Sequence, residues 1–130
     1  MESRIICLDT SVLFDYFRKK KKENSFFLEL MANYDFFEIT SITAFEIKYG
    51  INPIQFEFWD SLLSAVKVLP FDNEAADIAV EIHQELKKIN KQVALPDLFI
   101  ASIALRFNRP LATLNRKHFG RIPDIDIIIP

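Results

Sequence analysis

Three acidic residues stand where an alternating strand and helix fold would gather carboxylates. Asp9 directly follows the apolar run 5–8, and Asp97 stands at the start of a helical run. Glu46 comes after the strand-like segment 36–39 and a helix start. In an open parallel sheet, sites form at the carboxyl ends of the strands, where all three junctions would lie. Carboxylates gathered there repel one another, so the pattern predicts a site for Mg²⁺ or Mn²⁺.

Each acid also has a local explanation that involves no metal. The first turn of a helix favours acidic side chains, which would account for Asp9 and for Asp97 after Pro96. Glu46 follows Thr43 at the spacing of a capping box, in which the two side chains satisfy the free N–H groups of a helix start. From the three positions alone, helix capping and metal binding both remain open.

The acids need a scaffold of alternating strands and helices, and the sequence predicts one. Hydrophobic periodicity and breaker residues predict strands at 4–8, 36–40, 66–69, 111–113 and 125–129. They predict helices at 11–20, 25–33, 41–50, 53–64, about 72–89, 96 to before Pro110, and a short turn or helix at 116–119. Ser41 and Asp72 are the expected N-caps of two of them. This order predicts a three-layer α/β fold, with about five mainly parallel strands and helices on both faces.

Size and composition fit a single domain spanning residues 1–130. The chain is 50% hydrophobic and has a net charge of −2, so a core can form and no overall basic field indicates nucleic-acid binding. Cys7 is the one cysteine and lies in an apolar strand, as expected in a reducing compartment. No run approaches the roughly 20 apolar residues of a membrane span. We therefore expect a cytoplasmic protein without a membrane partner.

Aromatic and basic residues suggest further roles. Thirteen residues are phenylalanine, and seven aromatic residues are expected to pack the core, although some of them suit an association surface. These seven are Phe26, Phe27, Phe36, Phe37, Phe56, Phe58 and Trp59. The basic run 18–22, together with Arg116 and Lys117, suits RNA phosphates or a solvated helix end. His83 lies in the long amphipathic helix and is expected at the surface.

Four sequence blocks, taken in order, carry a family resemblance. They read LDTSVLFDYF at 8–17, TSITAFEIKYG at 40–50, LPDLFIASIAL at 95–105 and LATLNRKHF at 111–119. Together they resemble PIN-domain endoribonucleases, most closely the VapC-type toxins of type II toxin–antitoxin pairs. The resemblance covers essentially the whole chain. It implies a Rossmann-like PIN fold, Mg²⁺- or Mn²⁺-dependent cleavage of RNA, a cognate antitoxin partner and a homodimer.

The resemblance also assigns roles by position. Asp9, Glu46 and Asp97 match the family's acidic metal-site residues, and these three would be catalytic. A cation held there would activate water and stabilise charge on the phosphate. The supporting polar residues would be Thr10, Ser11, Thr113 and Asn115.

The chain departs from the family pattern at His118. Many relatives carry an acid there, three residues after the position of Asn115. Hard Mg²⁺ prefers oxygen ligands, so a solvent-facing or phosphate-contacting histidine is expected rather than a metal ligand. Asp124 and Asp126 precede the last strand and are expected to be surface acids at the opposite end of the sheet.

Two other functions compete with the nuclease. A catalytically silent PIN domain that binds RNA or a protein partner is suggested by the missing fourth acid at His118. A phosphoacceptor or phosphatase domain would use Asp9 as a nucleophile. The D-x-D-x-T pattern of an aspartyl phosphatase is absent, however, because position 11 is serine.

Overall fold

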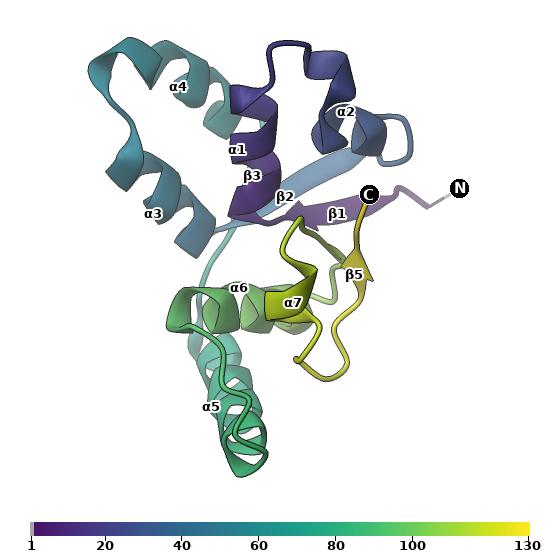
Figure 1. The fold of residues 1–130 in the computed structure, drawn as a ribbon, viewed down its shortest axis with the longest axis vertical. Coiled ribbons are helices and arrows are strands. Elements are labelled where there is room, and N and C mark those ends of the chain that lie inside the picture. The colour runs from purple at the N-terminus through teal and green to yellow at the C-terminus, as the bar shows by residue number, and fades with distance from the viewer. Residues whose placement is uncertain (1) are drawn as a thin grey trace.

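The computed structural model describes residues 2–130 and contains a five-stranded parallel sheet (Figure 1). The strand order is β3-β2-β1-β4-β5, and all four neighbouring pairs are parallel. The strands are β1 (Ile5–Leu8), β2 (Phe36–Thr40), β3 (Lys67–Leu69), β4 (Leu111–Ala112) and β5 (Ile127–Ile128). The α-helices are α1 (Thr10–Arg18), α2 (Phe26–Met31), α3 (Ser41–Gly50), α4 (Phe56–Ser64), α5 (Asn73–Lys88), α6 (Leu95–Arg106) and α7 (Arg116–Phe119). Two 3-10 turns, η1 (Lys22–Asn24) and η2 (Pro53–Gln55), precede α2 and α4.

Helices cover both faces of the sheet, which confirms the predicted three-layer α/β fold. Successive residues of a strand point to opposite faces. Ile6 and Leu8 therefore join a core cluster with residues of α1, α2, α3 and α4, whereas Cys7 joins the cluster built by α5, α6 and α7. Figure 1 shows α1–α4 on one side of the sheet and α5–α7 on the other. Burial raises the pKa of the Cys7 thiol, and the carboxylates of Glu38 and Asp9 raise it further.

Two helix starts test the predicted caps. The side chain of Asp72 accepts a 2.9 Å hydrogen bond from the Ala75 N–H, which confirms Asp72 as the N-cap of α5. The prediction for Ser41 is wrong, because Thr40 is the N-cap of α3 and accepts from the Thr43 N–H at 3.1 Å. Ser41 is the first helical residue, and its Oγ instead accepts a hydrogen bond from the Phe71 N–H.

Most of the expected core aromatics are buried, and two are not. Phe26, Phe27 and Trp59 are buried, and Phe37 and Phe58 pack against the same core cluster. The prediction of core packing is wrong for Phe36 and Phe56. Each is half-exposed, begins a strand or a helix, and belongs to neither core cluster. Between residues 2 and 130, no helix has the length and apolar character needed to span a bilayer.

The strand order fixes where a site can form. From β1 the chain builds outward through β2 to β3, and it later returns to the other side of β1 with β4 and β5. The order thus reverses between β1 and β4, and such a switch point leaves a crevice at the carboxyl ends of the two strands. Asp9 follows β1 directly, and Thr113 follows β4 directly.

Candidate active site

A pocket of about 550 Å³ lies at the carboxyl ends of β1 and β4. It brings together all three predicted acids and three of the four predicted supporting residues. These are Asp9, Thr10, Ser11, Glu46, Asp97 and Asn115. The remaining wall is formed by residues that were not predicted to belong to the site: Phe14, Asp15, Arg18, Lys19 and Leu114.

Asp9 is held at the base of the pocket by two hydroxyl groups. Ser11 Oγ donates a 2.7 Å hydrogen bond to Asp9 Oδ2, and Thr113 Oγ1 donates one of 2.8 Å to the same oxygen. Both hydroxyls are themselves oriented by backbone donors, because Ser11 Oγ accepts from the Leu114 N–H and Thr113 Oγ1 from the Asn115 N–H. Asp9 is only 2% exposed and Thr113 is fully buried, so this arrangement is part of the folded interior.

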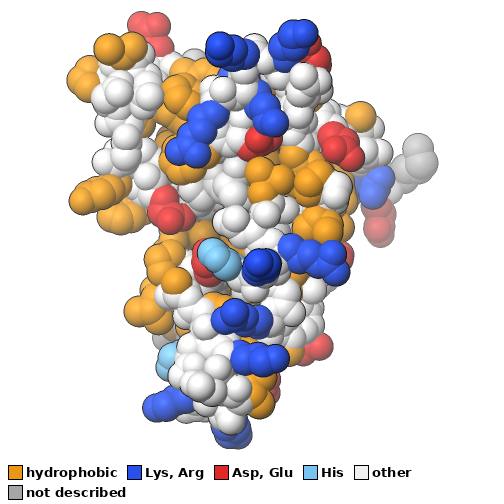
Figure 2. Space-filling view, in the orientation of Figure 1, with side chains coloured by type: hydrophobic (Ala, Val, Ile, Leu, Met, Phe, Trp, Pro, Cys, Tyr) orange, Lys and Arg blue, Asp and Glu red, His pale blue; other side chains and the backbone are white. Residues whose placement is uncertain are grey.

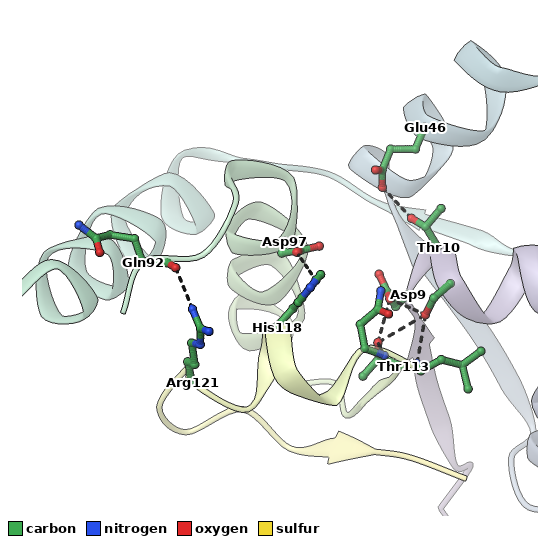
Figure 3. Close-up of polar contacts among 11 residues, drawn as sticks. Asp9, Thr10, Glu46, Gln92, Asp97, Thr113, His118 and Arg121 are labelled. Atoms are coloured by element: carbon green, nitrogen blue, oxygen red, sulfur yellow. Dashed lines mark hydrogen bonds and ion pairs between the residues drawn. The ribbon is translucent and has the colours of Figure 1, made fainter. Parts of the chain in front are cut away.

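Glu46 extends from α3 toward the start of α1 (Figure 3). Thr10 Oγ1 donates a 2.7 Å hydrogen bond to Glu46 Oε1 and lies 2.9 Å from Thr43 Oγ1. The capping-box interpretation of Glu46 is therefore wrong, because Thr40 caps α3 and the carboxylate of Glu46 is bound across the pocket instead.

Asp97 lies in the first turn of α6 and contacts His118 of α7. Nδ1 of His118 lies 3.0 Å from Asp97 Oδ2, and Figure 3 shows the two side chains pointing toward one another. Burial raises the pKa of Asp97 and the charge of Asp9 raises it further, whereas His118 lowers it by charge and hydrogen bonding. His118 has a largely exposed side chain, as expected, but its contact with Asp97 was not predicted.

The three acids therefore share one feature. In each of them one carboxylate oxygen lies next to a side-chain donor: Thr10, Ser11 and Thr113 donate hydrogen bonds to Glu46 and Asp9, and Nδ1 of His118 lies 3.0 Å from Asp97. Asn115 also lines the pocket, and its side-chain carbonyl adds to the carboxylate and hydroxyl oxygens there. The potential metal ligands are therefore oxygen atoms. Nevertheless, within residues 2–130 no three His, Cys, Asp or Glu side chains converge into a ready-made metal site.

The basic run is divided between two roles. Arg18 and Lys19 line the pocket, and the Arg18 guanidinium lies over the Phe14 ring at 5.2 Å. Lys22 turns inward, where its ammonium donates to the carbonyls of Tyr16 and Phe17 at the end of α1. Helical spacing could have identified the pocket residues, because 11, 14, 15 and 18 share one face of α1.

The remaining predicted residues lie outside the pocket. Arg116 and Lys117 are exposed on α7, near His118 but not in the pocket wall. Asp124 and Asp126 are exposed, and they line a separate cavity with Pro110, which directly precedes β4. The prediction that these two acids lie at the surface, at the opposite end of the sheet, is confirmed. Figure 2 shows blue basic side chains beside and below the pale blue histidine at the centre of this face, where it lies over a red acidic side chain, and a second group of basic side chains at the top.

Comparison with known proteins gives one family. A sequence model of the PIN domain matches residues 6–125. Ribonuclease VapC of Rickettsia bellii is 30% identical over 131 residues, covering 95% of this chain and 94% of that protein. Ribonuclease VapC1 of Methanocaldococcus jannaschii is 34% identical over 129 residues, covering 98% of this chain and 88% of that protein.

A solved structure agrees with the sequence matches. The structure of VapBC2 from Rickettsia felis, bound to a DNA fragment from its promoter, superposes with a TM-score of 0.83 and 27% identity. That match covers 97% of this chain and 98% of the other. With the fold, the pocket and these relatives in agreement, the chain belongs to the PIN-domain family, alongside the VapC ribonucleases.

Proposed function

We propose that the chain is a Mg²⁺- or Mn²⁺-dependent endoribonuclease and the toxin of a type II toxin–antitoxin pair. One observation carries the proposal: Asp9, Glu46 and Asp97, from three separate elements, line one pocket at the switch point of the sheet. The names of the two VapC relatives support RNA as the substrate.

The pocket suits a hydrated divalent cation. Its oxygen donors match the preference of Mg²⁺, which is held by one or two carboxylates and keeps several of its waters. The pocket volume of about 550 Å³ leaves room for such a hydrated ion and for a phosphate group. This mode of binding does not require three converging carboxylates, so it agrees with the separation of the acids among the described residues. A bound cation would supply water activation and stabilisation of charge on the phosphate.

The residues of the chain divide the remaining work. Asp9 and Asp97 would bind the cation, and Glu46, which belongs to α3, would face the cation from the opposite side of the pocket. Asn115 would orient water or substrate through its side-chain amide, because it lines the pocket on an exposed turn. Arg18 and Lys19 would bind RNA phosphates from the pocket wall.

Arg116 and Lys117 would extend the phosphate track beyond the pocket. Both are exposed on α7, next to His118. Such local cations can hold a polyanion even though the net charge of the chain is −2.

A catalytically silent PIN domain is the second candidate. It is favoured by the engagement of two acids with protein donors, Glu46 with Thr10 and Asp97 with His118. Such a domain would bind RNA or a protein partner without cutting it.

Protein partners would use exposed apolar side chains. Phe45 and Tyr49 of α3 are 60% and 82% exposed and pack ring to ring at 5.5 Å, and Ile54 of η2 is 94% exposed. We propose that a cognate antitoxin and a second copy of the chain cover such surfaces, because burying exposed apolar area favours association. The resemblance to VapC toxins supports both partners. The cytoplasm would be the site of action.

Incubation of purified protein with structured RNA, in EDTA and then with Mg²⁺ or Mn²⁺, tests the proposal. Cleavage should require the cation and should be lost in Asp9→Asn but kept in Asp77→Asn, which changes an exposed acid of α5. RNA binding without cleavage in either cation would support the silent domain. Cleavage that continues unchanged in EDTA would reject the metal-dependent mechanism.

A further inference from the structure

We propose that His118 is a positioning residue, which holds the Asp97 carboxylate in the pocket through Nδ1 and is not itself a ligand of the cation. This inference rests on the proposed function, because it concerns the same site.

The contact between His118 and Asp97 joins helix α7 to helix α6. His118 Nδ1 lies 3.0 Å from Asp97 Oδ2, a good hydrogen-bond distance. Phe119, the next residue on α7, is fully buried in the core cluster that contains Leu98 and Ile100 of α6. The backbone N–H of His118 also donates to the Asn115 carbonyl at 3.0 Å. The imidazole is therefore carried by a helical turn that is anchored beside α6.

The position of Nδ1 beside Asp97 determines what the imidazole can do if Nδ1 carries the hydrogen. An Nδ1 atom that donates its hydrogen to Asp97 has no lone pair available for a cation. Only Nε2 remains, on a side chain that is 59% exposed, whereas the Asp97 side chain is 19% exposed. Since hard Mg²⁺ prefers oxygen, the ligand on this side of the pocket is the carboxylate, and the histidine orients it.

The other two acids are held in the same way. Thr10 binds one oxygen of Glu46, and Thr113 binds one oxygen of Asp9. His118 supplies the corresponding donor to Asp97. Asp97 and Asp9 repel one another, so a donor beside Oδ2 of Asp97 helps to keep this carboxylate at the pocket wall.

Three substitutions at position 118 separate positioning from ligation. An asparagine amide nitrogen stands near the place of Nδ1, and a glutamine amide nitrogen near that of Nε2. The measurement is the Mn²⁺ dissociation constant, obtained by electron paramagnetic resonance without RNA. His118→Ala should weaken Mn²⁺ binding about tenfold, as expected for loss of a residue that orients a ligand. His118→Asn should recover most of that loss, and His118→Gln should resemble alanine.

His83→Ala is the matched control, because it removes the other histidine of the chain, which lines a separate groove between α5 and α6. It should leave the Mn²⁺ dissociation constant unchanged. Thermal unfolding without metal verifies that each variant is folded. If His118→Gln binds like the wild type and His118→Asn does not, Nε2 is a ligand and the inference is wrong. Unchanged binding in His118→Ala also overturns it, whereas a wild type that binds no Mn²⁺ overturns the proposed metal site as well.

Discussion

Thr113 and Asp9 are 104 residues apart in the sequence, yet the Thr113 hydroxyl donates a 2.8 Å hydrogen bond to Asp9 Oδ2. The bond joins the ends of β4 and β1, the two strands between which the order of the sheet reverses. The same hydroxyl accepts from the Asn115 N–H at 2.9 Å. One buried threonine thus links the position of the acid to the position of the turn that carries Asn115.

Thr113→Val should separate this positioning from folding. Valine fills nearly the same volume but cannot donate to Asp9, so cation affinity and the RNA cleavage rate should each fall about tenfold. Thr113→Ser keeps the hydroxyl and should retain most of both. Calorimetric titration with Mn²⁺ and a cleavage time course provide the two measurements. Wild-type values for the valine variant would show that the hydrogen bond has no part in the function of the site.

Neutralising each acid should abolish cleavage and leave the fold intact. In Asp9→Asn, Glu46→Gln and Asp97→Asn the shape is kept and one negative charge is lost. Without metal, Asp97→Asn should raise the melting temperature, because it removes repulsion between Asp97 and Asp9. Calorimetric melting in EDTA and growth inhibition in cells provide the measurements. Full toxicity in all three variants would contradict the assignment of these acids.

The stability of the metal-free protein should depend on pH through Asp97. Burial and Asp9 raise the pKa of Asp97 in the folded chain above the ordinary aspartate value of about 3.9. Between these two values the folded state binds more protons than the unfolded state, so the contribution of Asp97 to the free energy of unfolding falls as pH rises. Urea denaturation in EDTA isolates this contribution as wild type minus Asp97→Asn. A difference that increases with pH through this window would contradict the raised pKa.

Arg18 and Lys22 should differ in effect although both belong to one basic run. Arg18→Ala removes a cation from the pocket wall and should reduce RNA affinity and the slope of affinity with salt. Lys22→Ala removes donors to two carbonyls and a cation 5.0 Å from the Tyr16 ring. It should mainly lower the free energy of unfolding, by about 1 kcal/mol. Filter binding of an uncleavable RNA at several salt concentrations measures the affinity of each variant and distinguishes Arg18→Ala from Lys22→Ala. Equal salt slopes for both variants would contradict this division.

Much of the fold and of the pocket was accessible from the sequence. Apolar runs and helical periodicity predicted all five strands, and the strand-end rule placed Asp9 correctly. The same rule was wrong for Asp97, which follows helix α5 and a loop rather than a strand and reaches the pocket from the first turn of α6. Element ends were less accurate, because caps depend on neighbouring segments. Ser41 was the predicted N-cap of α3, yet Thr40 takes that role, and Ser41 Oγ accepts a hydrogen bond from the Phe71 N–H between β3 and α5.

The donors to the acids were harder to predict. Thr10 lies 36 residues from Glu46, and no local pattern shows that its hydroxyl will bind that carboxylate rather than cap a helix. The contact of His118 with Asp97 depends on the packing of α7 against α6, which the sequence does not encode as a motif. The exposure of Phe36 and Phe56 has the same origin, because the burial of the first residue of a strand or helix depends on which other segments cover it.

The most direct test of the central claim is a crystal soaked with Mn²⁺ and measured at a wavelength where manganese scatters anomalously. The account predicts one dominant anomalous peak in the pocket, in contact with Asp9 and Asp97, and no such peak in Asp9→Asn crystals grown under the same conditions. A manganese peak that lies elsewhere, or an empty pocket in a protein that cleaves RNA with Mn²⁺ in solution, would contradict it.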